Sequence, residues 1–210
     1  VQALNGAPIE GVRLVSPDRC SRSQVEAVHD SDYVEAVITG GPGAGGNGFT
    51  WTIDLWPMVS GSTGGVIAAV REAFRTRGIA GSLSSGLHHA RADHGSGFCT
   101  INGIAVAIHQ VLRDGAKRVL VLDVDAHCGG GTASMIRTSS HVSMSDDTPT
   151  SVASGFAPPV VRLLNKPVIP FTFRKSINRV SIARTSVIEP TEVRLVIGSK
   201  TTTDGLKRFT

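Results

Sequence analysis

The 210-residue chain is poor in aromatic residues and cysteine, and it has no long apolar run. Aromatic residues make up 5% of it, and Tyr33 is its one tyrosine. Its three cysteines, Cys20, Cys99 and Cys128, form no CxxC pair, so we expect no disulfide framework and a reducing, cytoplasmic location. No segment reaches the ~18–20 consecutive apolar residues of a membrane span, so we expect no membrane partner. The remaining composition predicts one soluble globular domain, or most of one.

Charge and glycine are distributed unevenly along the chain. Residues 1–136 carry a net charge of −2 and 21 of the 24 glycines, whereas residues 137–210 carry a net charge of +6. The basic residues of the later segment are scattered singly and are not interleaved with aromatic residues, so we do not expect a nucleic-acid site. The change close to residue 137 predicts two segments of different character.

Helical and strand patterns alternate up to about residue 136. Apolar spacing predicts three helical segments, at residues 23–38, 62–77 and 102–113. Strands are predicted at residues 79–84, 118–124, 141–147, 160–164, 168–173 and 193–197. The nearly continuous apolar run at 118–124 is typical of a strand that is buried on both faces. This alternation, with glycine-rich loops between the elements, predicts an α/β fold with a mostly parallel sheet.

The most informative polar residues come at the end of the strand predicted at 118–124. Asp123, Asp125 and His127 alternate along the chain, so their side chains lie on one side of an extended segment. Carboxylates and an imidazole at the carboxyl edge of a sheet are typical ligands of a divalent metal. The alternative interpretation is a strand end that is merely capped by polar residues. The glycines at 129–131, which let backbone approach a ligand closely, favour the metal site.

A second polar loop lies before the helix predicted at 102–113. His88 and His89 are adjacent in it. Beside a metal-bound water, such a pair is typical of acid–base chemistry, with one imidazole as general base and the other as its electrostatic partner. The alternative is a pair of packed histidines. If the catalytic interpretation is right, the pair must converge with Asp125 and His127 on one cavity.

Together these residues resemble the histone deacetylase family, including its acetylpolyamine and acetoin-utilisation relatives. The resemblance rests on GLHHARADHGSGFCTING (86–103) and VLVLDVDAHCGGGT (119–132), with support from VHDSDYVEAV (28–37) and STGG (62–65). It covers about residues 20–136. It implies the three-layer arginase/deacetylase fold with a mostly parallel sheet, incomplete here at its C-terminus. It also implies zinc-dependent hydrolysis of an acetyl-lysine or acetylpolyamine amide.

The resemblance also implies roles for individual residues. Asp125 and His127 match two of three zinc ligands, and Asp123 matches a ligand of a structural potassium ion. The cofactors implied are therefore Zn²⁺ and K⁺.

The same comparison of positions implies catalytic and substrate-binding residues. His88 and His89 match the proton-handling pair, with His89 as the proton-transfer residue and Asp123 as the partner of His88. Gly97 and Phe98 match the wall of the channel that holds the acylated amine, a lysine or a polyamine.

Three parts of the family's site are missing from the sequence. Gly130 stands where the family usually has an Asp or Asn partner for the second histidine, no later acid has the context of the third zinc ligand, and Tyr33 lies too early to be the catalytic tyrosine. We therefore expect weak or absent zinc binding and low activity. We divide the chain into the N-terminal part of a deacetylase-like domain (1–136) and an atypical segment (137–210) that a truncated or frame-shifted gene would produce. The start at Val1 agrees with a fragment.

Two other functions are compatible with these residues. The first is a catalytically inactive deacetylase-like binding module, which the missing ligand and tyrosine favour. The second is an arginase-like ureohydrolase, but this needs a further Asp where the chain has Gly129. The sequence does not indicate an oligomeric state.

Overall fold

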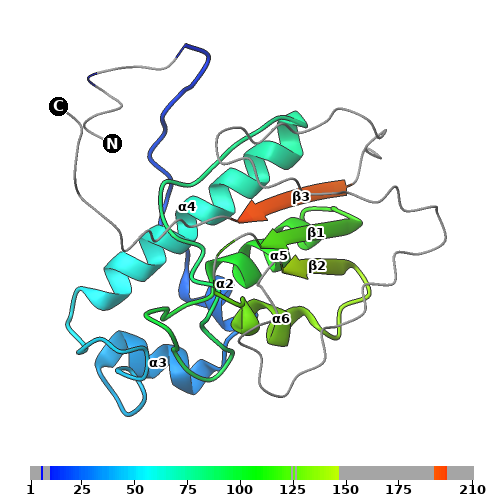
Figure 1. Ribbon diagram of the computed structural model, residues 1–210. Helices are drawn as coiled ribbons and strands as arrows, with labels where there is room; N and C mark the ends of the chain where they lie inside the picture. Colours follow the sequence, from blue (N-terminus) through cyan, green and yellow to red (C-terminus); the bar gives the residue numbers. More distant parts are fainter. Residues whose placement is uncertain (1–5, 7–9, 124, 126, 147–191, 198–210) are drawn as a thin grey trace, which may run out of the picture.

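The computed structural model describes residues 6, 10–123, 125, 127–146 and 192–197 (Figure 1). Its principal elements are α2 (Arg22–Glu26), α3 (Ser31–Thr39), α4 (Leu55–Thr76), α5 (Gly103–Arg113), β1 (Arg118–Asp123), α6 (Gly130–Ile136), β2 (Val142–Asp146) and β3 (Glu192–Ile197). The three strands form a parallel sheet in the order β2–β1–β3. Helix α4 packs on α5, which in turn contacts β1, so helices and a parallel sheet share one core as predicted. In the described part of the chain, no helix is both long and apolar enough to cross a bilayer.

Strand β1 lies at the centre of the described sheet because it pairs with a strand along both edges. Val119 is in register with Val142 of β2 and with Val193 of β3. Side chains along β1 alternate, so that Val119 and Val121 are buried while Leu120 is 37% exposed. The predicted strand is confirmed. The prediction that it is buried on both faces was wrong, because only alternate side chains are buried, in the core between β1 and α5.

Helix α5 confirms its prediction, with Asn102 as the residue that caps its N-terminus. Helix α4 begins at Leu55, seven residues before the predicted start at 62. Leu55 and Val59 continue the buried stripe of Val66 and Val70 toward the N-terminus, which extends the apolar face. Pro57 is tolerated in this first turn because the missing N–H has no partner within the helix there.

Several other predicted elements can be compared with the structure. Residues 23–38 form α2 and α3, separated near His29 as the polar interruption predicted. Residues 79–84 form no strand, contrary to prediction, and the exposure of Ile79 (97%) and Leu83 (68%) shows that this segment buries no apolar face. Strands β2 and β3 confirm the predictions at 141–147 and 193–197. The predictions at 160–164 and 168–173 lie outside the described residues.

His29 is a buried histidine that joins the start of α3 to two other segments. It is 3% exposed, its Nε2 accepts a hydrogen bond of 3.0 Å from the backbone N–H of Asn102, and its Nδ1 lies 3.2 Å from the carbonyl oxygen of Ala92. A neutral imidazole with its proton on Nδ1 satisfies both contacts. Burial lowers the pKa of His29 from 6.5 to about 4, so the folded protein holds this ring neutral.

Folding stability is therefore expected to fall when the pH is lowered through the range from 6.5 to about 4. The unfolded chain binds a proton at His29 in this range and the folded chain does not, so roughly 2–3 kcal/mol present at pH 7 is lost near pH 4.5. Urea unfolding at the two pH values measures the loss. A His29→Gln variant keeps one donor and one acceptor but does not titrate, so its stability should change less. An equal loss in both proteins would show that His29 is not responsible.

Candidate active site

The structure brings the two predicted loops together at the carboxyl end of β1. His88 Nδ1 lies 2.8 Å from Asp123 Oδ2, and His88 Nε2 lies 3.1 Å from His89 Nε2 and 3.8 Å from Asp125 Oδ1. The ring centroids of His89 and His127 are 6.0 Å apart. The two carboxylates and three imidazoles thus form one cluster, in which the histidine pair of one loop faces the strand end of the other.

Asp123 is the buried anchor of this cluster. Its side chain is completely buried, Oδ1 accepts a hydrogen bond of 3.1 Å from the backbone N–H of Asp125, and Oδ2 faces His88. A Cβ atom at Gly129 would collide with Oδ2 of Asp123 and lie 3.3 Å from Nδ1 of His88. The glycine loop is therefore required for the close approach of α6 to the histidine–aspartate pair. Through Asp123, the end of β1 fixes the proton on Nδ1 of His88 and leaves Nε2 toward His89.

Asp125 and His127 form a second pair beside the first. Asp125 Oδ1 accepts a hydrogen bond of 2.8 Å from the backbone N–H of His127 and lies 3.0 Å from His127 Nδ1. Burial would raise the pKa of Asp125, but these hydrogen bonds outweigh it and hold the pKa below its ordinary value. The Asp125 side chain is only 2% exposed, whereas that of His127 is 64% exposed. The site therefore presents an ionised carboxylate and an imidazole that is open to solvent.

His89 lies between this cluster and a tight turn. Burial, followed by the neighbouring His88, lowers the pKa of His89, which keeps the imidazole neutral at pH 7 and able to accept a proton. A Cβ atom at Gly97 would lie 2.6 Å from Cδ2 of His89, so only glycine fits beside the ring. Gly97 and Phe98 have φ angles of +52° and +62°, and the turn is closed by hydrogen bonds of 2.8 and 3.0 Å between Ser96 and Cys99. This turn places Gly97, the first of the two predicted wall residues, next to His89, and Phe98 follows it directly in the chain.

Comparison with known proteins agrees with this geometry. Residues 1–146 match the family model described as the histone deacetylase domain. The chain belongs to the histone deacetylase domain family. The match confirms the resemblance seen over residues 20–136 and extends it on both sides, through β2.

Individual members of the family support the same assignment. The chain is 32% identical over 130 residues to the acetoin utilization protein AcuC of Bacillus subtilis, which covers 56% of this chain and 34% of AcuC. It is 37% identical over 128 residues to a probable deacetylase of Methanothermobacter thermautotrophicus, covering 59% and 38% of the two chains. The crystal structure of an HDAC homologue from Aquifex aeolicus is similar with a TM-score of 0.58 and 27% identity, covering 68% of this chain and 41% of that one. The likeness confirms the arginase/deacetylase fold, and the chain spans less than half the length of these three relatives.

The described residues supply only part of the ligand set that a histone deacetylase needs for zinc. A catalytic zinc ion takes three protein ligands and leaves a fourth position for water or substrate. In the described part of the chain, no group of three or more His, Cys, Asp and Glu side chains is placed to hold a metal ion. Asp125 and His127 therefore do not fit a catalytic zinc ion by themselves. The sequence has no tyrosine besides Tyr33. The lack of a third zinc ligand stays a prediction, because residues 147–191 and 198–210 lie outside the description.

Two supporting residues of the candidate site were not singled out from the sequence. Asn102 is completely buried, and its Nδ2 donates hydrogen bonds to the Ala90 carbonyl (2.9 Å) and to Oγ1 of Thr132 (3.0 Å). The backbone N–H of Thr132 donates to the carbonyl of His88 at 2.9 Å. The sequence showed Asn102 at the start of a helix. Its second role, holding the histidine loop, depends on contacts that no local pattern indicates.

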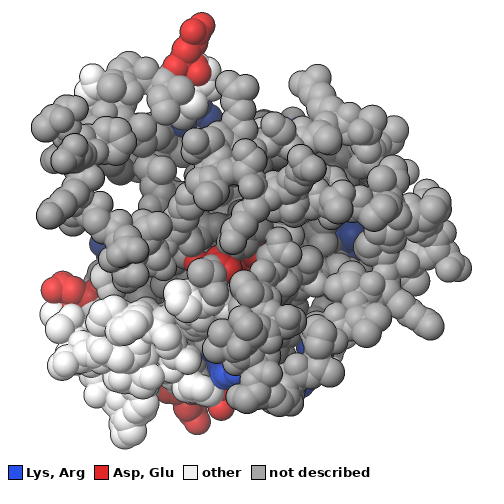
Figure 2. Space-filling model, in the orientation of Figure 1, with Lys and Arg blue, Asp and Glu red and all other residues white. Residues whose placement is uncertain are grey.

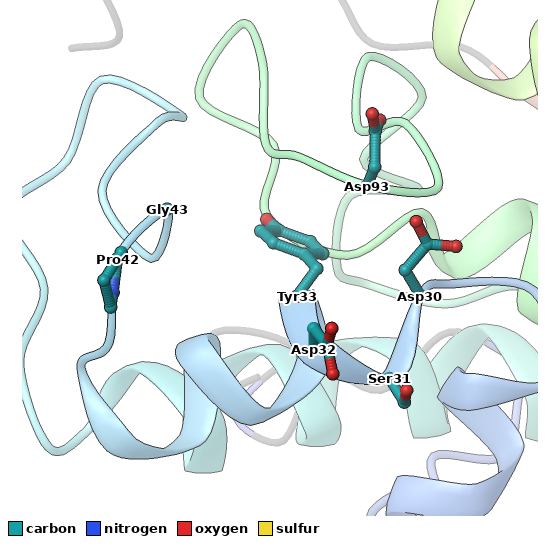
Figure 3. A pocket seen from close by; sticks show the side chains of 7 residues that line it. All are labelled: Asp30, Ser31, Asp32, Tyr33, Pro42, Gly43 and Asp93. Carbon is teal, nitrogen blue, oxygen red and sulfur yellow. The ribbon is translucent and has the colours of Figure 1, made fainter.

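A surface cavity of about 440 Å³ lies apart from this cluster (Figure 3). It is lined by Asp30, Ser31, Asp32, Tyr33, Pro42, Gly43 and Asp93. Figure 3 shows Asp93 on a loop opposite the start of α3, and the Tyr33 hydroxyl points away from α3 and donates to the carbonyl of Thr100 at 2.8 Å. None of the predicted site residues is among the residues that line this cavity.

The described basic side chains form no continuous patch on the face of the molecule that Figure 2 shows. The Lys and Arg atoms visible there lie in small areas that are separated from one another.

Proposed function

We propose that this chain carries the N-terminal part of a deacetylase site that binds an acetyl-lysine or acetylpolyamine amide and, when the site is complete, hydrolyses it with zinc. The observation that carries this proposal is the contact of His88 with both Asp123 and His89 beside Asp125. An aspartate-oriented imidazole in contact with a second, neutral imidazole is an arrangement suited to proton transfer.

The residues of the chain itself can perform two tasks in this reaction. Asp123 holds a proton on Nδ1 of His88, which leaves Nε2 of His88 unprotonated. The Nε2 atoms of His88 and His89 face each other at 3.1 Å, so the pair can hold a proton that is taken from water. Gly97 and Phe98 bind the aliphatic part of the amide next to His89. Asp125 and His127 offer two donors to zinc, and we assign no step to the metal because the described residues do not complete its ligand set.

The strongest alternative is a binding module without turnover. Asp125 and His127 favour this alternative, because two donors alone would hold zinc weakly. The residues of the channel wall could still bind the amide. The arginase-like reading is disfavoured by Gly129, where a side chain would collide with Asp123. A second metal ligand therefore has no room at that position.

We also propose a potassium site at Asp123, a cytoplasmic location, and a division of the chain into a deacetylase-like part and an atypical segment whose boundary lies after β2 and not near residue 137. The domain family match continues to residue 146, so the deacetylase-like part includes β2. The buried, unpaired thiols of Cys20 and Cys99, whose pKa values are raised by burial, agree with a reducing compartment.

With added zinc, the chain is expected to hydrolyse a fluorogenic acetyl-lysine substrate at least about 10²–10³-fold more slowly than ordinary zinc hydrolases. The reason is the loss of a transition-state hydrogen bond that the missing tyrosine would donate, together with an incomplete ligand set. Residual turnover should vanish in His89→Ala and be removed by a chelator. The matched control is His94→Ala, which changes an exposed histidine paired with Asp93 outside the cluster.

The outcomes separate the two functions. Residual turnover that depends on His89 but not on His94 supports the hydrolase. Binding of an acetyl-lysine peptide without turnover, lost in His89→Ala, supports the binding module. Turnover that survives His89→Ala would contradict the assignment of the site, and turnover near that of ordinary zinc hydrolases would contradict the expected lack of ligands.

A further inference from the structure

Two exposed phenylalanine rings contact each other beside the histidine pair. The centroids of Phe49 and Phe98 are 5.4 Å apart with an interplanar angle of 55°. Phe49 is 48% exposed and Phe98 is 67% exposed, so the pair leaves a large apolar surface in water. The rings come from the glycine-rich loop 41–50 and from the turn at 96–99, which are distant in sequence. Their contact therefore has to be held by the fold.

Asn47 holds both rings in place. It is 2% exposed, its backbone carbonyl accepts a hydrogen bond of 2.9 Å from the N–H of Phe98, and its Oδ1 accepts one of 3.0 Å from the N–H of Phe49. Its Nδ2 donates to Oγ1 of Thr100, next to the turn. A single buried side chain thus anchors the glycine-rich loop on the turn that carries Phe98.

The backbone of Phe98 is strained, and Phe98 lies in the chain next to the residue that contacts His89. A φ of +62° is unfavourable for a bulky residue and costs on the order of 1 kcal/mol or more. Such conformations persist where the surroundings enforce them, commonly at functional sites. Gly97, the preceding residue, lies directly against the His89 ring. A continuous series of contacts therefore leads from His89 through Gly97 and Phe98 to Phe49.

We propose that Phe49 is a further substrate-contact residue, which continues the wall of Phe98, and that Asn47 is its positioning residue. This inference rests on the proposed function. Because the two rings touch, the substrate cannot pass between them and instead lies along one wall made of both. Phe98 contacts the aliphatic linker of the acylated amine, and Phe49 contacts whatever follows the linker. The site should thus favour amides whose amine carries an apolar or aromatic group beyond the linker.

Two probes with the same acetamide test this specificity. One is acetyl-lysine joined to methylcoumarin, which has an aromatic group beyond the linker, and the other is N-acetylputrescine, which has none. Phe49→Ala is expected to weaken binding of the coumarin probe about 3–10-fold, the value of one aromatic contact, and to change the Kd of N-acetylputrescine less than about 2-fold. Phe49→Tyr should restore the difference between the probes. Asn47→Ala should reduce it, because the N–H of Phe49 loses its Oδ1 acceptor and the glycine-rich loop loses its side-chain bond to Thr100, while the backbone bond to Phe98 remains.

The test compares the Kd values of the two probes in each variant. Fluorescence gives the Kd of the coumarin probe, and NMR titration gives that of N-acetylputrescine. The control is Ile79→Ala, which removes a 97% exposed side chain from a different segment. Urea unfolding of each variant verifies that it folds, and the ratio of the two Kd values is insensitive to a general loss of structure. Weaker binding of the coumarin probe in Phe98→Ala but not in Phe49→Ala would overturn this inference and leave the proposed function intact. Failure of the unmodified chain to bind either probe would overturn the proposed function and this inference with it.

Discussion

Replacing Gly131 by Ala is expected to destabilise the protein by at least about 3 kcal/mol and to displace the histidine pair. Gly131 is the second residue of α6, and a Cβ atom there would collide with the carbonyl of Ala90 and lie 2.5 Å from the carbonyl group of His89. These are backbone atoms that cannot rotate away, so either α6 or the histidine loop must move. The movement would also strain the hydrogen bond between the N–H of Thr132 and the carbonyl of His88.

The neighbouring glycine provides a matched control for this substitution. A Cβ atom at Gly130 would have Nη2 of Arg91 as its nearest neighbour, at 3.7 Å, which is an ordinary contact. Gly130→Ala should therefore be neutral or stabilise α6 by up to about 1 kcal/mol. Urea unfolding gives the two stabilities, and imidazole NMR signals report on the histidine pair. Similar stabilities for the two variants would contradict the close packing of α6 against the loop.

The central fold elements could be predicted because their patterns are local. Helix α5 has a clear apolar periodicity and a capping asparagine, and β1 is a short apolar run between charged residues. The start of α4 was missed because its first two turns contain Trp56, Pro57 and Met58, which lack a strong helical pattern and are stabilised by tertiary burial of Leu55. The prediction of a strand at 79–84 was wrong for the opposite reason, since the apolar residues Ile79 and Leu83 are exposed and gain little burial.

Some residues of the candidate site could likewise be predicted from local sequence patterns, and others could not. Alternation of Asp123, Asp125 and His127 follows from the two-residue period of a strand, so the sequence predicted that they share one side. Contact of this group with His88 followed from the expectation that both loops belong to one sheet edge, and the structure places His88 against Asp123. Asn47 and Phe49 could not be found in this way. Their importance comes from contacts with residues about fifty positions away, which the glycine-rich loop around them does not reveal.

Replacing Asn102 by Ala is expected to cost about 3 kcal/mol and to loosen the histidine loop. Its Oδ1 accepts from the N–H of Ala105 at 3.0 Å and so caps α5, which contributes about 1 kcal/mol. Its Nδ2 satisfies the carbonyl of Ala90 and contacts Oγ1 of Thr132. An alanine would leave the buried carbonyl of Ala90 without this donor, and the loss of a buried partner costs a further 1–3 kcal/mol or so.

A serine at position 102 separates these two contributions. Asn102→Ser keeps a side-chain oxygen that caps α5 but is too short to reach the carbonyl of Ala90, so it should recover only the cap, about 1 kcal/mol. Amide hydrogen exchange in the segment 88–91 should therefore remain faster than in the unmodified protein, although α5 regains its protection. The Thr132→Ser variant, which retains the hydroxyl, should leave exchange in this segment nearly unchanged. Full recovery of protection in Asn102→Ser would mean that the cap alone matters, and that Asn102 does not position the loop on which His88 and His89 depend.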